Sequence, residues 1–137
     1  MIRQTEIRIP AKRTGCFDIT KMVLGSLPGL PMKGLVHLYL QHTSAGLTIN
    51  ESYDPAVMHD FDIYLNRIVP RDVDFLTHTI EGPDDMPSHV KTALVGTSVS
   101  IPVIDHQLGL GRWQGIWLCE FRDIPRERRI WATVMGD

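Results

Sequence analysis

The segment GLVHLYLQHTSAGLTINE, residues 34–51, decides the fold because it places two strands on either side of a short break. Its first part, residues 34–41, is rich in the branched and aromatic side chains that favour strands. After the HTSA break, residues 46–51 alternate apolar and polar side chains, which suits a half-buried strand. The second strand therefore lies between His42 and Glu51, two side chains suited to acid–base or metal chemistry.

Working outward from this segment, the sequence predicts an α+β fold: a mainly antiparallel β-sandwich with three helices, in a single domain of residues 1–137. The clearest helix begins at Asp54 and Pro55, because the carboxylate accepts hydrogen bonds from first-turn amides and proline fits the first helical position. The order of the elements is not the repeating βαβ pattern of a parallel sheet. The predicted strands are residues 1–10, 34–41, 46–51, 97–104, 115–121 and 129–135, and the predicted helices are residues 18–27, 54–69 and 87–95.

The composition excludes several classes of function. The net charge is −2, with 43% hydrophobic and 22% charged residues, so we expect no nucleic-acid partner. No apolar run approaches the roughly 20 residues needed to span a bilayer, and we expect no membrane partner. The first residues, MIRQTEIRIPAKR, lack the apolar stretch of a signal peptide, which favours a cytoplasmic location.

The two cysteines, Cys16 and Cys119, match no CxxC spacing. A disulfide between them remains open, but without an export signal we expect two reduced thiols. No neighbouring residue lowers the pKa of Cys119 in an obvious way, so we interpret it as a core residue.

Three of the six histidines stand at the end of a predicted element or in a loop. His42 ends a strand, His78 lies in a loop, and His89 opens a helix, so a scaffold can aim all three into one cleft. Three imidazoles and an open position form the ligand set of many catalytic zinc sites. Zinc is therefore the expected cofactor, with magnesium as the alternative divalent ion. No HxH or HExxH spacing ties the three together, and three unrelated surface residues are the competing interpretation.

The loop EGPDDMPSHVK, residues 81–91, concentrates acids ahead of a helix. Asp84 can orient histidine ligands or transfer protons. Asp85 either caps the following helix or acts in the site, and both interpretations stay open. Lys91 follows His89 by two residues, so the two side chains project about 200° apart on an ideal helix.

The segment LGLGRWQGIWLCEFRD, residues 108–123, carries further candidates. Arg112 and Gln114 can contact a phosphate or a pyrimidine edge. Trp113 can stack on a ring, although a tryptophan in such a segment is usually core. Glu120 stands in an apolar strand and needs a partner, such as an arginine or a metal.

Three stretches, HTSAGLTINESYDP, EGPDDMPSHVK and SIPVIDHQLGLGRWQGIWLCEFRD, together resemble the YjbQ-like family, whose members often carry the name secondary thiamine-phosphate synthase. The resemblance covers roughly residues 5–136. It implies a compact α+β sandwich, a homotrimer and a metal-associated, histidine-lined site. The residues that match its polar motif positions are His42, Thr43, Ser44, Asn50, Glu51, His78, Asp84, Asp85, His89, Lys91, Gln114 and Glu120.

Combining the resemblance with the residue chemistry gives one set of expected roles. Glu51, Asp84 and Glu120 are the candidate catalytic residues, and His42, His78 and His89 are the candidate metal ligands. The candidate substrate-binding residues are Ser44, Asn50, Lys91, Arg112 and Gln114.

Three functions fit these residues, and we expect the first, which the resemblance implies, with the other two as alternatives. The resemblance implies a weak thiamine-phosphate synthase that joins a pyrimidine diphosphate to a thiazole phosphate, with a small phosphorylated ligand and with Lys91 and Arg112 as cations. The residues suit a metal-dependent hydrolase at least as well. A non-enzymatic module that binds a metal or a small ligand is the third, and a site closed by four protein ligands would favour it.

Overall fold

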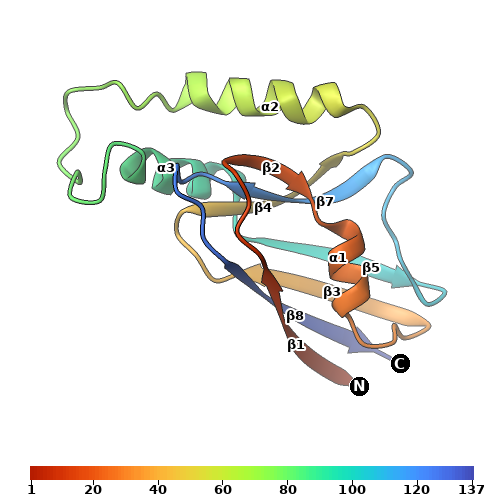
Figure 1. Ribbon diagram of the computed structural model, residues 1–137. Coiled ribbons are helices and arrows are strands. Elements are labelled where there is room, and N and C mark those ends of the chain that lie inside the picture. The colour runs from red at the N-terminus through yellow and green to blue at the C-terminus, as the bar shows by residue number, and fades with distance from the viewer.

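The computed structural model describes residues 1–137 as two antiparallel sheets stacked face to face, with three helices (Figure 1). This confirms the predicted α+β sandwich. The larger sheet has the order β1 (Ile2–Ile9), β8 (Arg128–Gly136), β3 (Lys33–Leu40), β5 (Ser98–Ile104) and β6 (Gln107–Leu108). The smaller sheet has the order β2 (Gly15–Asp18), β7 (Gln114–Glu120) and β4 (Ala45–Glu51).

Strand β7 forms the centre of the molecule because both of its faces are buried. Ile116 and Leu118 point into the main core between the two sheets. Trp117 and Cys119 point the other way, into a second cluster beneath the helices. This alternation is the two-residue period of a strand, and it produces three layers: helices, small sheet and large sheet.

The helices α2 (Pro55–Ile68) and α3 (Asp85–Val95) lie over the small sheet, and α1 (Thr20–Ser26) lies at the side of the sandwich (Figure 1). Asp54 caps α2 as predicted, since its Oδ1 accepts a hydrogen bond from the amide of Ala56 at 2.9 Å. Phe61 of α2 meets Trp117 edge to face, at 5.5 Å between ring centroids. No helix has both the length and the apolar character that a membrane crossing requires.

The structure differs from the predicted elements at short, tertiary features. Strands β2 and β6 were not predicted, because elements of four and two residues carry little pattern of their own and depend on pairing with β7 and β5. Helix α3 begins at Asp85 rather than at Pro87. Asp85 is therefore a first-turn residue whose side chain is free for other contacts, and Asp84 at the N-cap makes no side-chain cap.

Cys16 and Cys119 form a disulfide, so the expectation of two reduced thiols is wrong. The two residues stand directly opposite each other in the β2–β7 ladder, with 4.0 Å between their Cα atoms. This pairing depends on strand register across 103 residues, which spacing in the sequence does not reveal. The placement of Cys119 in the core is confirmed.

The backbones of β3 and β8 approach each other closely at Gly34, which predicts that a side chain is not tolerated there. A Cβ at Gly34 of β3 would overlap the carbonyl oxygen of Met135 in β8, and backbone in a ladder cannot move aside. We expect Gly34→Ala to lower the free energy of unfolding by about 1–3 kcal/mol or more, measured by urea denaturation. Gly25→Ala in α1, where a Cβ meets nothing within 4 Å, is the control and should be neutral or stabilising. Equal stability of the two variants would contradict the close approach.

Candidate functional site

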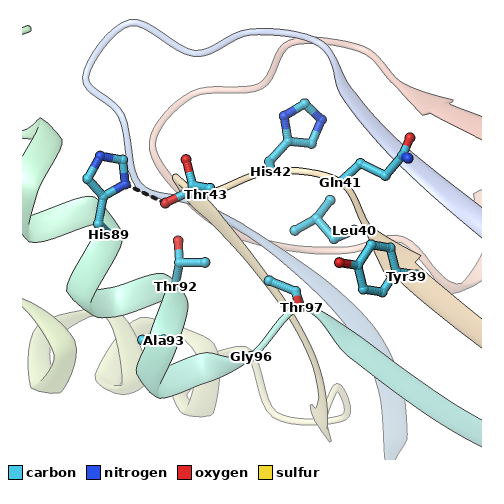
Figure 2. Close-up of a pocket in the computed structure, with 10 residues that line it drawn as sticks. All are labelled: Tyr39, Leu40, Gln41, His42, Thr43, His89, Thr92, Ala93, Gly96 and Thr97. Atoms are coloured by element: carbon cyan, nitrogen blue, oxygen red, sulfur yellow. Dashed lines mark hydrogen bonds between the residues drawn. The ribbon is translucent and has the colours of Figure 1, made fainter.

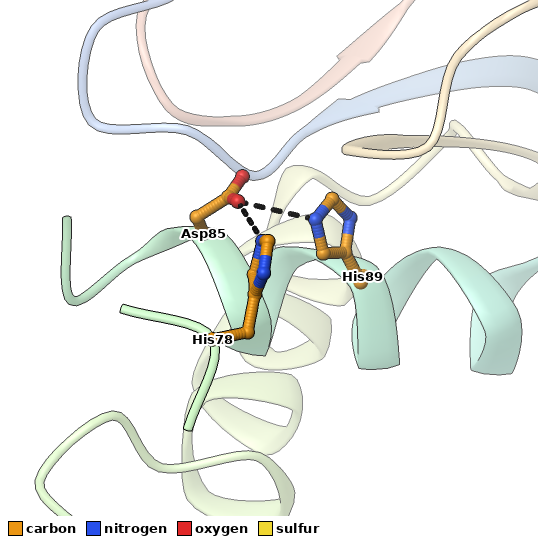
Figure 3. Close-up of side chains that lie close together, drawn as sticks. All are labelled: His78, Asp85 and His89. Carbon is orange, nitrogen blue, oxygen red and sulfur yellow. Dashed lines mark hydrogen bonds and ion pairs between the residues drawn. The ribbon is translucent and has the colours of Figure 1, made fainter. Parts of the chain in front are cut away.

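His78, Asp85 and His89 gather at the start of α3, and both imidazole rings point toward the same carboxylate (Figure 3). The Nε2 of His78 lies 2.7 Å from Asp85 Oδ2, and the Nε2 of His89 lies 3.2 Å from the same oxygen. His78 comes from the loop between α2 and α3. Asp85 and His89 are one helical turn apart, the spacing that brings two side chains together on a helix face.

The hydrogen bond at the other nitrogen of His89 fixes its tautomer. His89 Nδ1 lies 2.6 Å from the carbonyl oxygen of Thr43, which only accepts, so Nδ1 carries the proton. In the neutral ring, the lone pair of Nε2 then faces the Asp85 carboxylate. Two lone pairs in that position repel unless a proton or a metal cation lies between them.

Arg122 holds the second oxygen of Asp85. Its Nη1 donates to Asp85 Oδ1 at 2.8 Å, its Nε donates to Asp84 Oδ2 at 2.8 Å, and its Nη2 donates to the carbonyl of Glu81 at 2.9 Å. Burial acts to raise the pKa of Asp85, but the His78 hydrogen bond and the His89 and Arg122 charges outweigh it and the pKa lies below its ordinary value. Asp85 is thus an oriented anion with one oxygen aimed at two imidazoles.

These three residues fit a divalent ion with nitrogen and oxygen ligands. All three ligand atoms lie within 4.8 Å of one another. Ligands about 2.0–2.1 Å from a tetrahedral zinc lie about 3.3 Å apart, so the Asp85–His89 distance already suits such an ion and the Asp85–His78 distance is short by about half an ångström. Thr43 and Arg122 supply the outer hydrogen bonds that metal-ligating histidines and carboxylates usually have.

A cavity of about 890 Å³ adjoins His89 (Figure 2). In Figure 2, His42 and His89 come from different segments, with Thr43 between them. The lining contains no Asp, Glu, Lys or Arg and includes several hydroxyl groups. Its residues are Tyr39, Leu40, Gln41, His42, Thr43, His89, Thr92, Ala93, Gly96 and Thr97.

His42 lines this cavity but does not join the His78–Asp85–His89 group, so one chain does not bring the three expected histidine ligands together. Its Nε2 accepts a hydrogen bond from the amide of Arg129 at 2.8 Å. Burial lowers the pKa of His42, and the charges of Arg128 and Arg129 lower it further. The ring is therefore neutral, with its proton on Nδ1, and Asp85 stands in the group where His42 was expected.

Glu120 and Ser44 lie in a buried network around Arg128. The guanidinium of Arg128 donates to both oxygens of Glu120, with Nε 2.8 Å from Oε1. It also donates to the carbonyl and hydroxyl oxygens of Ser44, each at 3.0 Å. Arg128 is the partner that the inward carboxylate of Glu120 required. These contacts give Glu120 and Ser44 a structural role, and their catalytic and substrate-binding roles stay predictions.

Asp84 and Lys91 are also engaged away from the cavity. Asp84 Oδ2 accepts from Arg122 Nε and from the amide of Asp123. Lys91 donates to Asn66 Oδ1 at 2.6 Å, and burial lowers the pKa of its ammonium group. Lys91 lines a separate cavity of about 240 Å³, which agrees with its projection away from His89.

The remaining expected residues lie at the far end of β4. Glu51 ends that strand and pairs with Gln114 of β7, while Ala45 at the other end pairs with Glu120. Seven residues of strand span about 20 Å, so Glu51 and the histidines do not share a site within one chain. Asn50, Glu51, Arg112 and Gln114 stay predicted site residues in this second location.

Comparison with known proteins identifies the family of this chain. A family model described as UPF0047 protein YjbQ-like matches residues 5–137. The chain belongs to this family. UPF0047 protein YjbQ of Escherichia coli O157:H7 is 44% identical over 136 residues, 98% of each chain. UPF0047 protein YugU of Bacillus subtilis is 36% identical and covers 99% of this chain and 100% of its own.

A crystal structure with the same overall fold supports the fold of this YjbQ-like chain. The crystal structure of the conserved hypothetical protein TT1486 from Thermus thermophilus superposes with a TM-score of 0.84 at 34% identity. The match covers 96% of this chain and 99% of that one. The family resemblance is therefore confirmed, while the thiamine-phosphate synthase activity and the metal site that it implied stay predictions.

The sequence alone leaves the role of Asp85 open and does not identify Arg122 in this YjbQ-like site. The spacing of Asp85 and His89, four residues apart in a helix, is a signal for a shared face. Arg122 carries no such signal, because it lies 37 residues from Asp85 and reaches it only through the packing of the chain after β7 against the start of α3.

The buried ion pair predicts a large loss of stability when one partner is removed. We expect Glu120→Gln to lower the free energy of unfolding by about 3–5 kcal/mol, because Arg128 is left charged and buried. The double variant Glu120→Leu/Arg128→Met should recover most of that loss. Urea denaturation followed by circular dichroism measures both. A loss below about 1 kcal/mol in the single variant would refute the structural role.

The neutral state of His42 predicts a pH dependence of stability. Its pKa in the folded chain lies below the ordinary value of 6.5, so the unfolded chain binds the proton more readily. We expect the contribution of His42 to the free energy of unfolding to be fully present above pH 6.5. It is lost as the pH falls from there through the pKa of His42 in the folded chain. Urea midpoints from pH ~7.5 to ~5, measured with a chelator, should fall less steeply for His42→Gln, which accepts without titrating. Identical slopes for the two chains would contradict it.

Proposed function

We propose that this YjbQ-like protein is a metal-dependent hydrolase whose divalent ion, zinc, is held by His78, Asp85 and His89. One observation carries the proposal. The Nε2 atoms of both histidines converge on a single oxygen of Asp85, while Thr43 and Arg122 hold the remaining atoms of His89 and Asp85. With Nε2 deprotonated in both rings, the two nitrogens and the Asp85 oxygen would aim lone pairs at one region, as a metal requires.

The number of ligands favours catalysis over storage or a structural role. Three ligand atoms are present, fewer than the four of a closed structural zinc site. The side chain of His78 is 49% exposed, which gives a substrate access from the solvent side. A divalent ion in this position would act as a Lewis acid on water or on a substrate oxygen. A non-enzymatic binding module is therefore the less supported alternative.

The chain itself would bind and orient the substrate. His42 has its proton on Nδ1 and can donate it in a hydrogen bond to a ligand in the cavity. Thr92 and Thr97 add hydroxyl groups to the lining. The uncharged lining of this cavity suits a small polar ligand. The phosphorylated ligand that the resemblance implied would place its charge at the metal.

Proton transfer by the expected acids finds less support. The carboxylate of Asp84 already accepts hydrogen bonds from Arg122 and from the amide of Asp123, and that of Glu120 accepts from Arg128. Glu51 lies at the other end of β4. The hydrolase that we propose therefore relies on its metal ligands and on binding groups more than on a carboxylate base.

The thiamine-phosphate synthase activity is a second proposal with weaker support. Release of pyrophosphate needs cations where the negative charge develops. Lys91 lines another cavity, and Arg112 adjoins Trp113 at the distant end of β7, so neither stands beside the histidines in one chain. Joining these groups would need the proposed homotrimer, in which a neighbouring chain supplies the missing charges.

The metal site is tested by elemental mass spectrometry of the purified protein after incubation with zinc. We expect about one ion per chain, lost in His89→Gln and in Asp85→Asn because each removes one of three ligands. His59→Gln, at an exposed histidine of α2, is the matched control and should retain the ion. Full occupancy in the His89 and Asp85 variants, or none in the wild-type chain, would overturn the metal site.

Activity is tested separately on the same samples. Zinc-loaded protein should hydrolyse chromogenic p-nitrophenyl phosphate or acetate esters, and chelation or His89→Gln should abolish the rate. A second assay offers a pyrimidine diphosphate with a thiazole phosphate and measures thiamine phosphate. Product in the second assay alone would replace the hydrolase with the synthase, and bound zinc with neither activity would favour the binding module.

A further inference from the structure

An exposed aromatic pair marks a second cavity, at the far end of the small sheet from the histidines. Tyr53 is 78% exposed and Trp113 is 55% exposed. Their rings stack with centroids 6.2 Å apart and an angle of 28° between planes. Together with Glu51, Asp54 and Pro55 they line a cavity of about 530 Å³. Two large aromatic faces thus remain open to solvent beside two carboxylates.

The backbone ladder fixes this pair in place. Glu51 pairs with Gln114, and the amide of Ser52 donates to the carbonyl of Trp113 at 2.7 Å, which extends the β4–β7 pairing by one residue. The hydroxyl of Ser52 accepts from the indole of Trp117 at 2.8 Å. Tyr53 lies in the bend that follows β4, and Trp113 lies in the turn that precedes β7, so the two rings flank the paired ends of these strands.

The charged groups that line this cavity are the two carboxylates of Glu51 and Asp54. The side chain of Glu51 makes no hydrogen bond or ion pair, since Glu51 engages Asn50 Oδ1 only through its backbone amide. The first-turn donors of α2 are used or missing: Pro55 has no N–H, Ala56 donates to the Asp54 side chain, and Val57 donates to the Asp54 carbonyl. An anion would meet the negative charge of two carboxylates here, whereas a cation finds the unpaired carboxylate of Glu51.

We propose that this cavity binds a small, flat organic cation, such as a protonated amidine or amino-substituted heterocycle. Its ring would stack on Trp113 and Tyr53, and its N–H groups would donate to Glu51. The charge and the aromatic surface act together, because a cation is attracted both to a carboxylate and to the face of an aromatic ring. Arg112 does not line the cavity, so it leaves the acceptor free. This proposal is independent of the metal site.

The test follows the indole N–H signals of the three tryptophans by NMR while benzamidinium is added. Benzamide, a neutral molecule of the same shape, is the matched ligand. We expect a saturable shift of the Trp113 signal with benzamidinium and at least tenfold weaker binding of benzamide. Trp131, on the large sheet, is the internal control and should not shift.

Two variants separate the charge from the aromatic contribution. Glu51→Gln should weaken benzamidinium binding about tenfold and leave benzamide binding unchanged, whereas Tyr53→Ala should weaken both ligands. His89→Gln should change neither affinity, which keeps the result distinct from the metal site. Equal affinity for the two ligands, an unchanged affinity in Glu51→Gln, or a matching shift of Trp131 would each overturn the proposal.

Discussion

The ion pair between Arg128 and Glu120 is the constraint on which the rest of this structure depends. Arg128 begins β8 in the large sheet, whereas Glu120 ends β7 in the small sheet. Both side chains are 2% exposed, so each charge relies on the other for compensation. The pair fixes how the two sheets meet at this end of the sandwich. By also binding Ser44, it fixes the start of β4.

A short series of hydrogen bonds connects this buried pair to the histidine site at the surface. Glu120 accepts a hydrogen bond from the amide of Arg122 at 3.1 Å, and Arg122 in turn orients Asp85. Thr43, next to the anchored Ser44, holds His89. A buried, paired guanidinium therefore positions the carboxylate of Asp85, and a backbone carbonyl beside the buried Ser44 positions His89.

Local patterns predicted most elements, and long-range contacts account for what they missed. The cap at Asp54 and the alternating strand after the HTSA break are properties of neighbouring residues, and both were found. Strand β2 and the disulfide depend on register with β7, and the separation of Glu51 from the histidines depends on the length of β4. Pairings across many tens of residues leave no periodic trace in a single sequence.

The disulfide changes the topology of the chain. It joins residues 103 apart, so the backbone is a closed ring with two short tails. The ring contains His78, Asp85 and His89, while the C-terminal tail carries Arg122, which orients the carboxylate. In the entropic account, closing a ring of this size restricts the unfolded chain by about 4.7 kcal/mol. A single backbone cut within the ring would leave both pieces covalently joined, and only reduction would release them.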